Sequence, residues 1–327
     1  MPLKLTTYYK GSEVPDIPGS NVFHSKELFL VYEATPGYTP IMIVGYMDER
    51  PVVRLLAATR TSIRTFPPAF FRRCEVYGSG EYFDETINRE DIFGELLEHL
   101  TNEVLTSAFL VEFRNLDTPL FAYKYFRDNQ YFSINWLKVH NSLHSQTRAD
   151  ERISVSRRRQ IRKGFENGAE VYATTDKDEI LAFSKMLKKN YSSKLRKHFP
   201  SIDFFKNFNE ITAPKKMGKT FIVKYKDKII GGSVCAYTKD NAYLWFSGGL
   251  RKSYVLQYPG ILAVWKAIED AYLSGYQHLE FVDAGLPFRK HGYRDFVLRF
   301  GGKQSSTRRW YRFNWKWLNN LLIKIYS

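Results

Sequence analysis

The segment Gln257-Tyr258-Pro259-Gly260 has residue types that suit an anion-binding site. An apolar pattern from Ile261 to Leu273 predicts a helix directly after it, and Ser274-Gly275 predicts where that helix ends. The first amides of a helix have no intrahelical partner and lie at its positive end, so they bind phosphate groups. Proline and glycine also begin helices where no ligand binds. The segment alone is therefore consistent with a diphosphate site or with a plain helix start.

Two residues near this segment have acid–base chemistry. Asp283 follows the apolar strand pattern of His278 to Val282, and a carboxylate at a strand end can act as a base or hold an amine. An ordinary Asp-Ala-Gly turn is the competing interpretation. Histidine ordinarily titrates near pH ~6.5, so His291 is a candidate proton relay. A surface histidine in a basic loop is the alternative for that residue.

Basic residues concentrate at two places. The loop around His291 and the residues after it contain four candidates for phosphate binding: Arg289, Lys290, Arg294 and Arg299. A guanidinium fork suits phosphate, although loop charges are also commonly solvated. The run SRRRQIRKGFENG over residues 156–168 contains Arg158 and Arg162. On a helix these two lie one turn apart and repel each other unless an anion lies between them, which favours a binding role.

The whole chain is basic and rich in core-forming residues. It has 327 residues, 44% of them hydrophobic, and 49 Lys and Arg against 34 Asp and Glu, which gives a net charge of +15. This length and composition predict two folded domains. The surplus charge favours an anionic partner. Nucleic acid, a nucleotide cofactor, a diphosphate-linked precursor and an acidic membrane surface all fit.

Several other functions are disfavoured by the sequence. Cys74 and Cys235 lie in different halves, which predicts two buried thiols rather than a disulfide. His140 and His144 are four residues apart but lack an acidic partner, so we expect no metal site. We find no signal peptide pattern and no apolar stretch of the ~18 residues that a membrane span needs. A cytoplasmic protein is the expectation.

The C-terminal segment RRWYRFNWKWLNNLLIKIY, residues 308–326, interleaves Trp310, Trp315 and Trp317 with basic residues. Proteins that lie on a membrane surface combine aromatic and basic residues in this way. The alternative is a last strand and a packing helix that bury the aromatic rings in a core. A contact at the inner face of the membrane and a buried terminus therefore both remain open.

The same order of predicted elements occurs twice along the chain: helix, antiparallel hairpin, long helix, strand. The first passage comprises residues 25–32, 41–59, 89–105 and 108–113, and the second comprises 176–191, 220–237, 261–273 and 278–282. This predicts a mixed α/β (α+β) fold of two lobes, 1–148 and 149–327. Each lobe is expected to be a central, largely antiparallel sheet flanked by helices.

Four stretches, in this order, resemble a known family. They are the segment NVFHSKE at 21–27, the basic helix at 156–168, the Pro-Gly helix entry at 259–260, and the closing segment 281–302 with Asp283, Gly285 and Phe300-Gly301-Gly302. In these features the chain resembles the GNAT acyltransferases, and within them the FemAB branch of peptidoglycan-bridge aminoacyltransferases. Where that branch has an aromatic residue followed by lysine, this chain has Phe296 and Val297.

The resemblance implies an N-acyltransferase in which an amine attacks an activated carbonyl directly, without a covalent enzyme intermediate. In such a reaction, Asp283 and His291 are the candidate catalytic residues. Gln257, Tyr258, Gly260, Trp245 and Ser247 would bind the donor, with a backbone N–H of the strand around Trp245 to Gly248 on the oxyanion. Phosphates would contact the arginines and the lysine named above.

The anion-binding helix start at residues 257–260 favours acyl-CoA as donor, and so does the lack of a long heptad stretch for the tRNA-binding arm that the FemAB branch often has. The expected acceptor is an amine on an anionic precursor that is envelope-related or nucleotide-linked. An aminoacyl-tRNA donor is the alternative, favoured by the branch resemblance and the net charge. A third hypothesis is a non-catalytic module that binds polyanions or a membrane through its basic faces.

Overall fold

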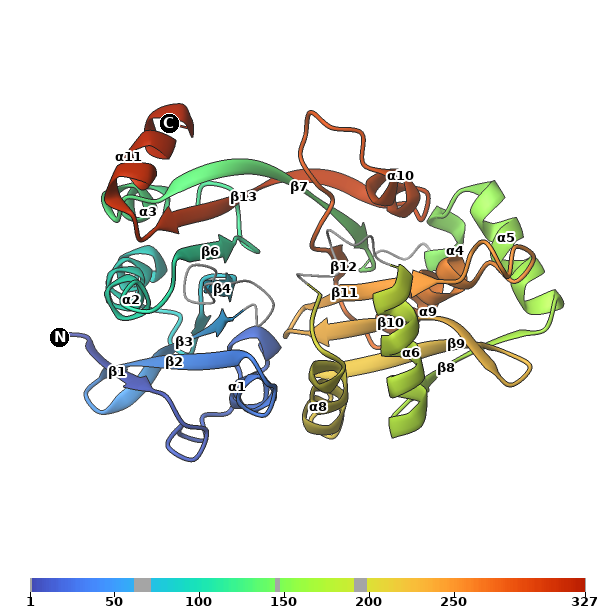
Figure 1. The fold of residues 1–327 in the computed structure, drawn as a ribbon, viewed down its shortest axis with the longest axis horizontal. Helices are drawn as coiled ribbons and strands as arrows, with labels where there is room; N and C mark the ends of the chain where they lie inside the picture. Colours follow the sequence, from blue (N-terminus) through green and yellow to red (C-terminus); the bar gives the residue numbers. More distant parts are fainter. Residues whose placement is uncertain (1, 62–71, 145–147, 191–198, 327) are drawn as a thin grey trace. The chain divides into compact units, whose positions relative to one another are not determined.

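The computed structural model describes residues 2–61, 72–144, 148–190 and 199–326 (Figure 1). The chain forms two compact units, one of residues 1–136 and 306–327 and the other of residues 137–305. Compared with the expected lobes 1–148 and 149–327, residues 137–148 cluster with the second unit and residues 306–327 with the first.

The first unit is a sheet with helices packed on it. Its strands are β1 (Lys4–Tyr8), β2 (Tyr38–Met47), β3 (Arg50–Arg60), β4 (Arg73–Tyr77), β5 (Glu81–Tyr82), β6 (Leu110–Arg114) and the second half of β13 (Lys303–Phe313). They lie in the order β1-β2-β3-β4-β6-β13, with β5 beside β3. Among the described strands of this unit, β4 and β6 pair in parallel and the other pairs are antiparallel. The helices are η1 (Val22–His24), α1 (Lys26–Glu33), α2 (Arg89–Val104), α3 (Tyr123–Asp128) and α11 (Lys316–Tyr326).

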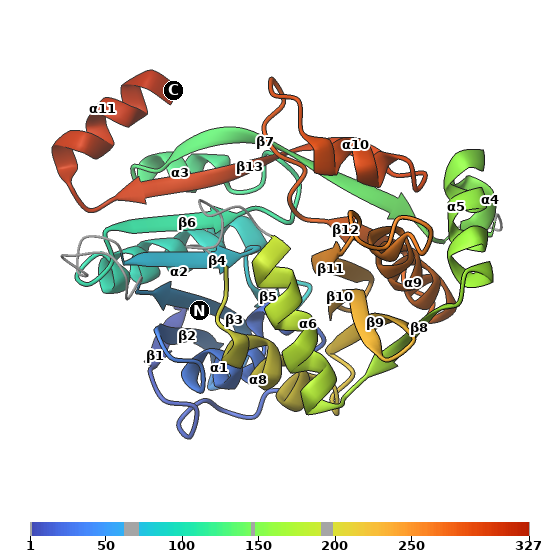
Figure 2. The same cartoon turned by 45° about the vertical axis from the view of Figure 1, so that its right-hand side comes forward.

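The second unit has the same plan (Figure 2). Its strands follow the order β7-β12-β11-β10-β9-β8. These are β7 (Phe132–Ser142), β8 (Ala169–Thr174), β9 (Gly218–Tyr225), β10 (Lys228–Tyr237), β11 (Asn241–Gly249) and β12 (His278–Phe281), of which β11 and β12 pair in parallel. The helices are α4 (Ala149–Arg152), α5 (Val155–Glu166), α6 (Lys177–Asn190), α8 (Ile202–Thr212), α9 (Pro259–Leu273) and α10 (Gly292–Leu298). The predicted fold class, mixed α/β with largely antiparallel sheets flanked by helices, is confirmed.

Strands β7 and β13 each begin in one unit and end in the other. The late strand β13 completes the sheet of the first unit, where Arg309 lies opposite Arg114 of β6. The earlier strand β7 completes the sheet of the second unit, where His140 lies opposite Glu280 of β12. Each sheet therefore depends on a segment far away in the sequence.

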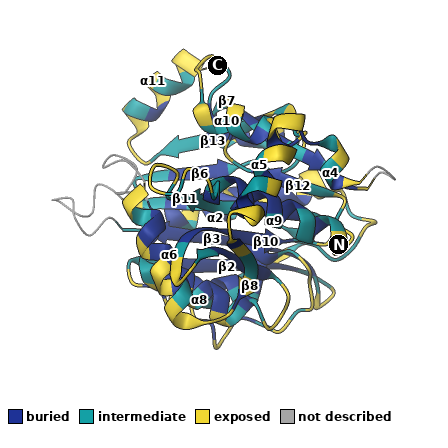
Figure 3. Ribbon diagram, turned by 90° about the vertical axis from the view of Figure 1, so that its right-hand side faces the viewer, coloured by how far each residue is buried: buried dark blue, intermediate teal, exposed yellow. Residues whose placement is uncertain are grey.

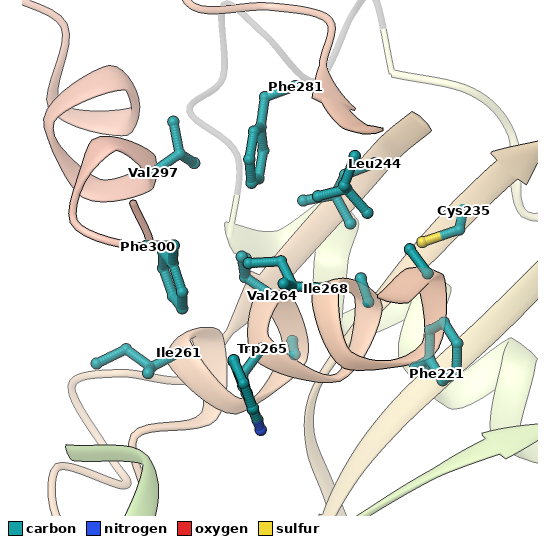
Figure 4. Close-up of a cluster of buried hydrophobic side chains, with 14 of the residues drawn as sticks. Phe221, Cys235, Leu244, Ile261, Val264, Trp265, Ile268, Phe281, Val297 and Phe300 are labelled. Carbon is teal, nitrogen blue, oxygen red and sulfur yellow. The ribbon is translucent and has the colours of Figure 1, made fainter. Parts of the chain in front are cut away.

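Helix α9 forms the centre of the core of the second unit (Figure 4). Its side chains Val264 and Ile268 lie in one buried cluster with Leu244, Phe281 and Val297. Val297 of α10 is completely buried. A lysine ammonium at this position would lose its hydration among apolar side chains, at a cost of several kcal/mol. The valine that replaces the family lysine therefore has a packing explanation in this chain.

Candidate functional site

Strands β11 and β12 separate part-way along the sheet of the second unit. Residues 241–244 pair in parallel with residues 278–281, and Leu244 opposite Phe281 is the last pair. Strand β11 continues to Gly249 along β10, with a bulge at Trp245 where the register shifts by one residue. Beyond Leu244, no described strand pairs with the edge of β11 that faces β12. The two residues expected at the donor site, Trp245 and Ser247, lie on this separated part of β11.

The start of α9 lies directly against the end of β11. A Cβ atom on Gly249 would come within 2.5 Å of the amide nitrogen of Gly260, so this approach requires glycine. Tyr258 precedes the helix in a left-handed conformation with φ of 48°. The amides of Ile261 and Leu262 both donate to the Tyr258 carbonyl. Within the described ranges, the amides of Gln257, Tyr258 and Gly260 have no hydrogen-bond partner. The expected segment thus presents free donors at a helix N-terminus.

Two exposed arginines lie near these elements. Arg251 begins the loop between β11 and α9, and Arg299 follows α10; no described carboxylate forms an ion pair with either. Burial lowers the pKa of Arg157 of α5 to about 10, and the positive charges of Arg299 and Arg251 add to this effect. Helix α5 also packs on α9, so Arg157, Arg251 and Arg299 lie in the same region of the second unit. Sequence patterns did not single out Arg251, since it is an isolated loop residue.

The basic run of α5 divides into a buried residue and exposed ones. Arg157 is buried between the rings of Phe296 and Phe300, at 4.7 and 4.6 Å, and donates to the Phe296 carbonyl. It therefore anchors α5 to α10. Arg158 is exposed, and Arg162 forms an exposed ion pair with Glu166 at 3.4 Å. This i,i+4 pair supplies a negative partner within the helix itself.

The predicted basic residues before and within α10 have different surroundings. Arg294 donates to three carbonyl oxygens, those of Ala284 (3.3 Å), Leu286 (2.9 Å) and Arg289 (2.7 Å). Its guanidinium therefore holds the loop in place. The side chains of Arg289 and Lys290 are exposed.

Asp283 and His291 lie at the two ends of the same loop. Asp283 is exposed and comes two residues after the end of β12. His291 is the N-cap of α10, where its Nδ1 atom accepts a hydrogen bond from the Arg294 amide at 3.3 Å. A Cβ atom on Gly285 would lie 2.7 Å from the His291 ring, so the loop packs closely on it. His291 thus has a structural contact in addition to the proposed chemistry.

Glu280 of β12 is a titratable residue that sequence analysis missed. It lies next to the last β11–β12 pair, is 8% exposed, and its Oε2 atom has no hydrogen bond within the described residues. Its one ion pair there is with Lys138 of β7, at 3.6 Å. Burial raises the pKa of Glu280, and the positive charge of Lys138 opposes that rise. The alternation of Leu279 and Phe281 around it indicated only a buried strand.

Two histidines lie close to Glu280. His140 is directly opposite it on β7, and the His140 and His278 rings are 5.5 Å apart. Burial lowers the pKa of both imidazoles, so both are mainly neutral at pH 7. The described residues contain no group of three or more His, Cys, Asp or Glu that could hold a metal ion.

Comparison with known proteins identifies the second unit. Residues 155–290 match the family model of the acetyltransferase (GNAT) domain. This segment is a GNAT domain. The match includes the separated strands and the start of α9, and it confirms the GNAT resemblance seen in the sequence. No curated protein matches the chain.

Solved structures share the fold over most of the chain. FemX is 11% identical with a TM-score of 0.66, and the match covers 99% of both chains. A tandem GNAT protein from the clavulanic acid biosynthesis pathway is 9% identical, with a TM-score of 0.55 and coverage of 96% of this chain and 99% of the other. The C-terminal domain of a putative lysylphosphatidylglycerol synthetase from Agrobacterium fabrum is 12% identical, with a TM-score of 0.51 and coverage of 82% and 84%. The chain therefore shares the fold of FemX and of the tandem GNAT protein over nearly its whole length.

The GNAT domain and the first unit share a local motif that was not predicted from the sequence. Glu112 of β6 and Glu280 of β12 each lie on the second strand of a parallel pair and are each followed by phenylalanine. In the first unit, Glu112 forms ion pairs with Arg73, Arg114 (3.2 Å) and Arg309 (3.3 Å). In the second unit, Glu280 forms an ion pair with one described residue, Lys138. The carboxylate of the GNAT domain is therefore the less neutralised of the two.

Proposed function

We propose that this protein is an N-acyltransferase that moves an acyl group from acyl-CoA to an amine on an anionic acceptor. One observation carries the proposal: free amides begin α9 beside a separated strand, inside a segment that matches the GNAT family model. A helix N-terminus of this kind favours a diphosphate. We place the reaction in the cytoplasm, where acyl-CoA is available.

The residues at this site fit a coenzyme A diphosphate. The amides of Gln257, Tyr258 and Gly260 would donate to its oxygens, and Arg251 and Arg299 would supply the charge. When bound, coenzyme A supplies an acyl group activated as a thioester. A backbone amide of β11 beyond Leu244 would donate to the oxygen that becomes negative during attack.

Glu280 is our proposed general base. Its carboxylate, held by the ion pair with Lys138, lies next to the point where β11 and β12 separate, and we expect it to accept the proton that the attacking amine loses. Asp283 and His291 stay alternative predictions for this role, and the exposed Arg158, Arg289 and Lys290 for binding the anionic part of the acceptor.

An aminoacyl-tRNA donor is the second candidate. The FemX-like fold and the net charge of +15 favour it. Saturable binding of coenzyme A without competition by charged tRNA would support acyl-CoA, whereas binding of tRNA alone would support the aminoacyl version. A non-catalytic module would bind polyanions with a strong salt dependence and acylate nothing.

A thiol-release assay tests the proposal. The protein is incubated with a panel of acyl-CoA donors and primary amines, and free coenzyme A is detected with a thiol reagent. Cys74 and Cys235 are both buried, so the background from the protein is expected to be low. We expect amine-dependent release and an acylated amine of matching mass. Release that is independent of amine, or none with any donor, would contradict an acyl-CoA-dependent transferase.

A further inference from the structure

Helix α11 has an outer face of exposed apolar side chains. Trp317, Leu321 and Ile325 are 65%, 49% and 60% exposed, and they lie on one side of the helix because they are spaced four residues apart. Trp315, just before the helix, is 43% exposed and stacks on Trp317 at 6.2 Å. Figure 3 shows several exposed segments along α11. Exposed tryptophans are uncommon on a surface that meets only water.

The opposite side of α11 is attached to the first unit. The Asn319 side chain is buried, accepts a hydrogen bond from the Phe313 amide and donates to the Gln130 carbonyl. The Tyr326 ring stacks on Phe132 at 5.6 Å. These contacts fix which face of the helix points outward. The exposed row is therefore a defined surface, which we call the outer face of α11.

Charge shows which partner suits the outer face. Residues 303–327 contain six basic residues and no acidic one: Lys303, Arg308, Arg309, Arg312, Lys316 and Lys324. Arg309 is buried in its ion pair with Glu112 and does not contribute to this surface. Lys316 and Lys324 are exposed on α11 itself, and Lys324 lies beside Leu321 and Ile325. Tryptophan and leucine enter the boundary between headgroups and acyl chains, and nearby lysines attract anionic headgroups. An apolar protein partner would not need this one-sided charge.

We propose that the outer face of α11 binds the surface of an anionic lipid bilayer. None of the helices in the described ranges is both long and apolar enough to cross a membrane, so this contact is peripheral. The helix lies in the plane of the interface, with Trp317, Leu321 and Ile325 among the lipids and Lys316 and Lys324 at the headgroups. The sequence had left membrane contact and burial open for this segment. In the structure the two alternatives apply to different residues: Trp310 is completely buried, whereas Trp315 and Trp317 are exposed.

Vesicle sedimentation of the full chain tests this proposal. We expect binding to vesicles of phosphatidylcholine with phosphatidylglycerol, and much weaker binding to phosphatidylcholine alone. The double variant Trp317→Gln/Leu321→Gln should lose about tenfold or more in affinity, because it removes buried apolar area. The double variant Lys316→Gln/Lys324→Gln should lose roughly tenfold on anionic vesicles at low salt and little on neutral ones.

Matched substitutions elsewhere provide the controls. Leu120→Gln/Leu273→Gln changes two apolar residues that are 68% and 73% exposed, and Lys215→Gln/Lys239→Gln removes two exposed lysines. Both should bind vesicles like the unmodified protein. Equal binding by all four variants, or no binding by the unmodified protein, would overturn the proposal. Self-association that Trp317→Gln/Leu321→Gln abolishes, without vesicle binding, would instead assign the outer face to a second copy of the chain.

Discussion

Replacing Glu280 by glutamine is expected to lower kcat/KM for amine acylation by about 10²- to 10⁴-fold, the usual contribution of a positioned acid–base group. Glutamine keeps the size of the side chain and cannot accept the proton. Glu280 is nearly buried, so a base from solvent has little access to replace it. The fold should persist, because the amide is the uncharged analogue of a group that burial already disfavours in its charged form.

The pH dependence of the reaction gives a sharper test of the same residue. Burial raises the pKa of Glu280, and only its deprotonated form can accept a proton. The kcat/KM of the unmodified protein should therefore rise with pH through a pKa above the ordinary glutamate value of about 4.3. In Glu280→Gln this acidic limb should disappear from the profile. A residue with only a structural role would leave the limb unchanged.

Three further variants separate Glu280 from its alternatives. Glu269→Gln removes a carboxylate of α9 that pairs with Lys266 and should retain activity and the acidic limb. Asp283→Asn and His291→Asn test the two residues proposed from sequence, and asparagine can still cap α10 at position 291. If Asp283→Asn loses the acidic limb while Glu280→Gln keeps it, the base is Asp283.

Replacing Glu112 by glutamine should destabilise the first unit by about 3–5 kcal/mol, the range for breaking a buried ion-pair network. Glu112 is completely buried and is shared by Arg73, Arg114 and Arg309. Glutamine occupies the same volume but leaves three guanidinium groups with one fewer negative charge. Because Arg309 comes from β13, the loss should also weaken the attachment of that strand to β6.

The network also predicts a pH effect on stability. Burial would raise the pKa of Glu75, but the charges of Arg114 and Arg73 outweigh it and hold this pKa below its usual range. A depressed carboxyl pKa contributes stability above the unfolded-state pKa of about 4.3, and that stability is lost as the pH falls through the folded-state value. Acid should therefore unfold the first unit through this network.

Urea unfolding monitored by circular dichroism measures the effect of Glu112→Gln. Two units can unfold separately, so the transition of the first unit must be followed on its own. Glu98→Gln is the control, because Glu98 is an exposed residue of α2, and it should change stability by no more than about 0.5 kcal/mol. An unchanged midpoint for Glu112→Gln would mean that the ion pairs add nothing to stability.

Local signals allowed much of the fold to be predicted from sequence. Ser25 begins α1 and accepts a hydrogen bond from the Leu28 amide, and the predicted helix of residues 261–273 is α9 with two residues added at its start. Strand β8 was missed because its six residues show no regular alternation of buried and exposed side chains. Helix α8 was missed although its buried residues Phe204, Phe208 and Thr212 are spaced four apart, as on one face of a helix. The pairing of β13 with β6 was not predictable, since it joins residues almost 200 positions apart and leaves no local pattern.

The candidate site was predicted only in part, for a related reason. The start of α9 has a local signal, Pro259-Gly260, and the structure places free amides there. Glu280 was missed because its candidate role depends on the separation of β11 from β12 and on the ion pair with Lys138, a residue of another strand. The contacts of Arg294 with three carbonyls were equally hidden, because an arginine looks the same in sequence whether it donates to backbone carbonyls or to phosphate.

Hydrogen exchange at the start of α9, with and without coenzyme A, tests the central claim most directly. The amides of Gln257, Tyr258 and Gly260 have no partner within the described residues, so they should exchange rapidly in the free protein. We predict that saturating coenzyme A slows exchange in peptides that contain residues 257–262. Binding of coenzyme A that leaves these amides fast while protecting another segment, or an absence of saturable binding, would contradict the account.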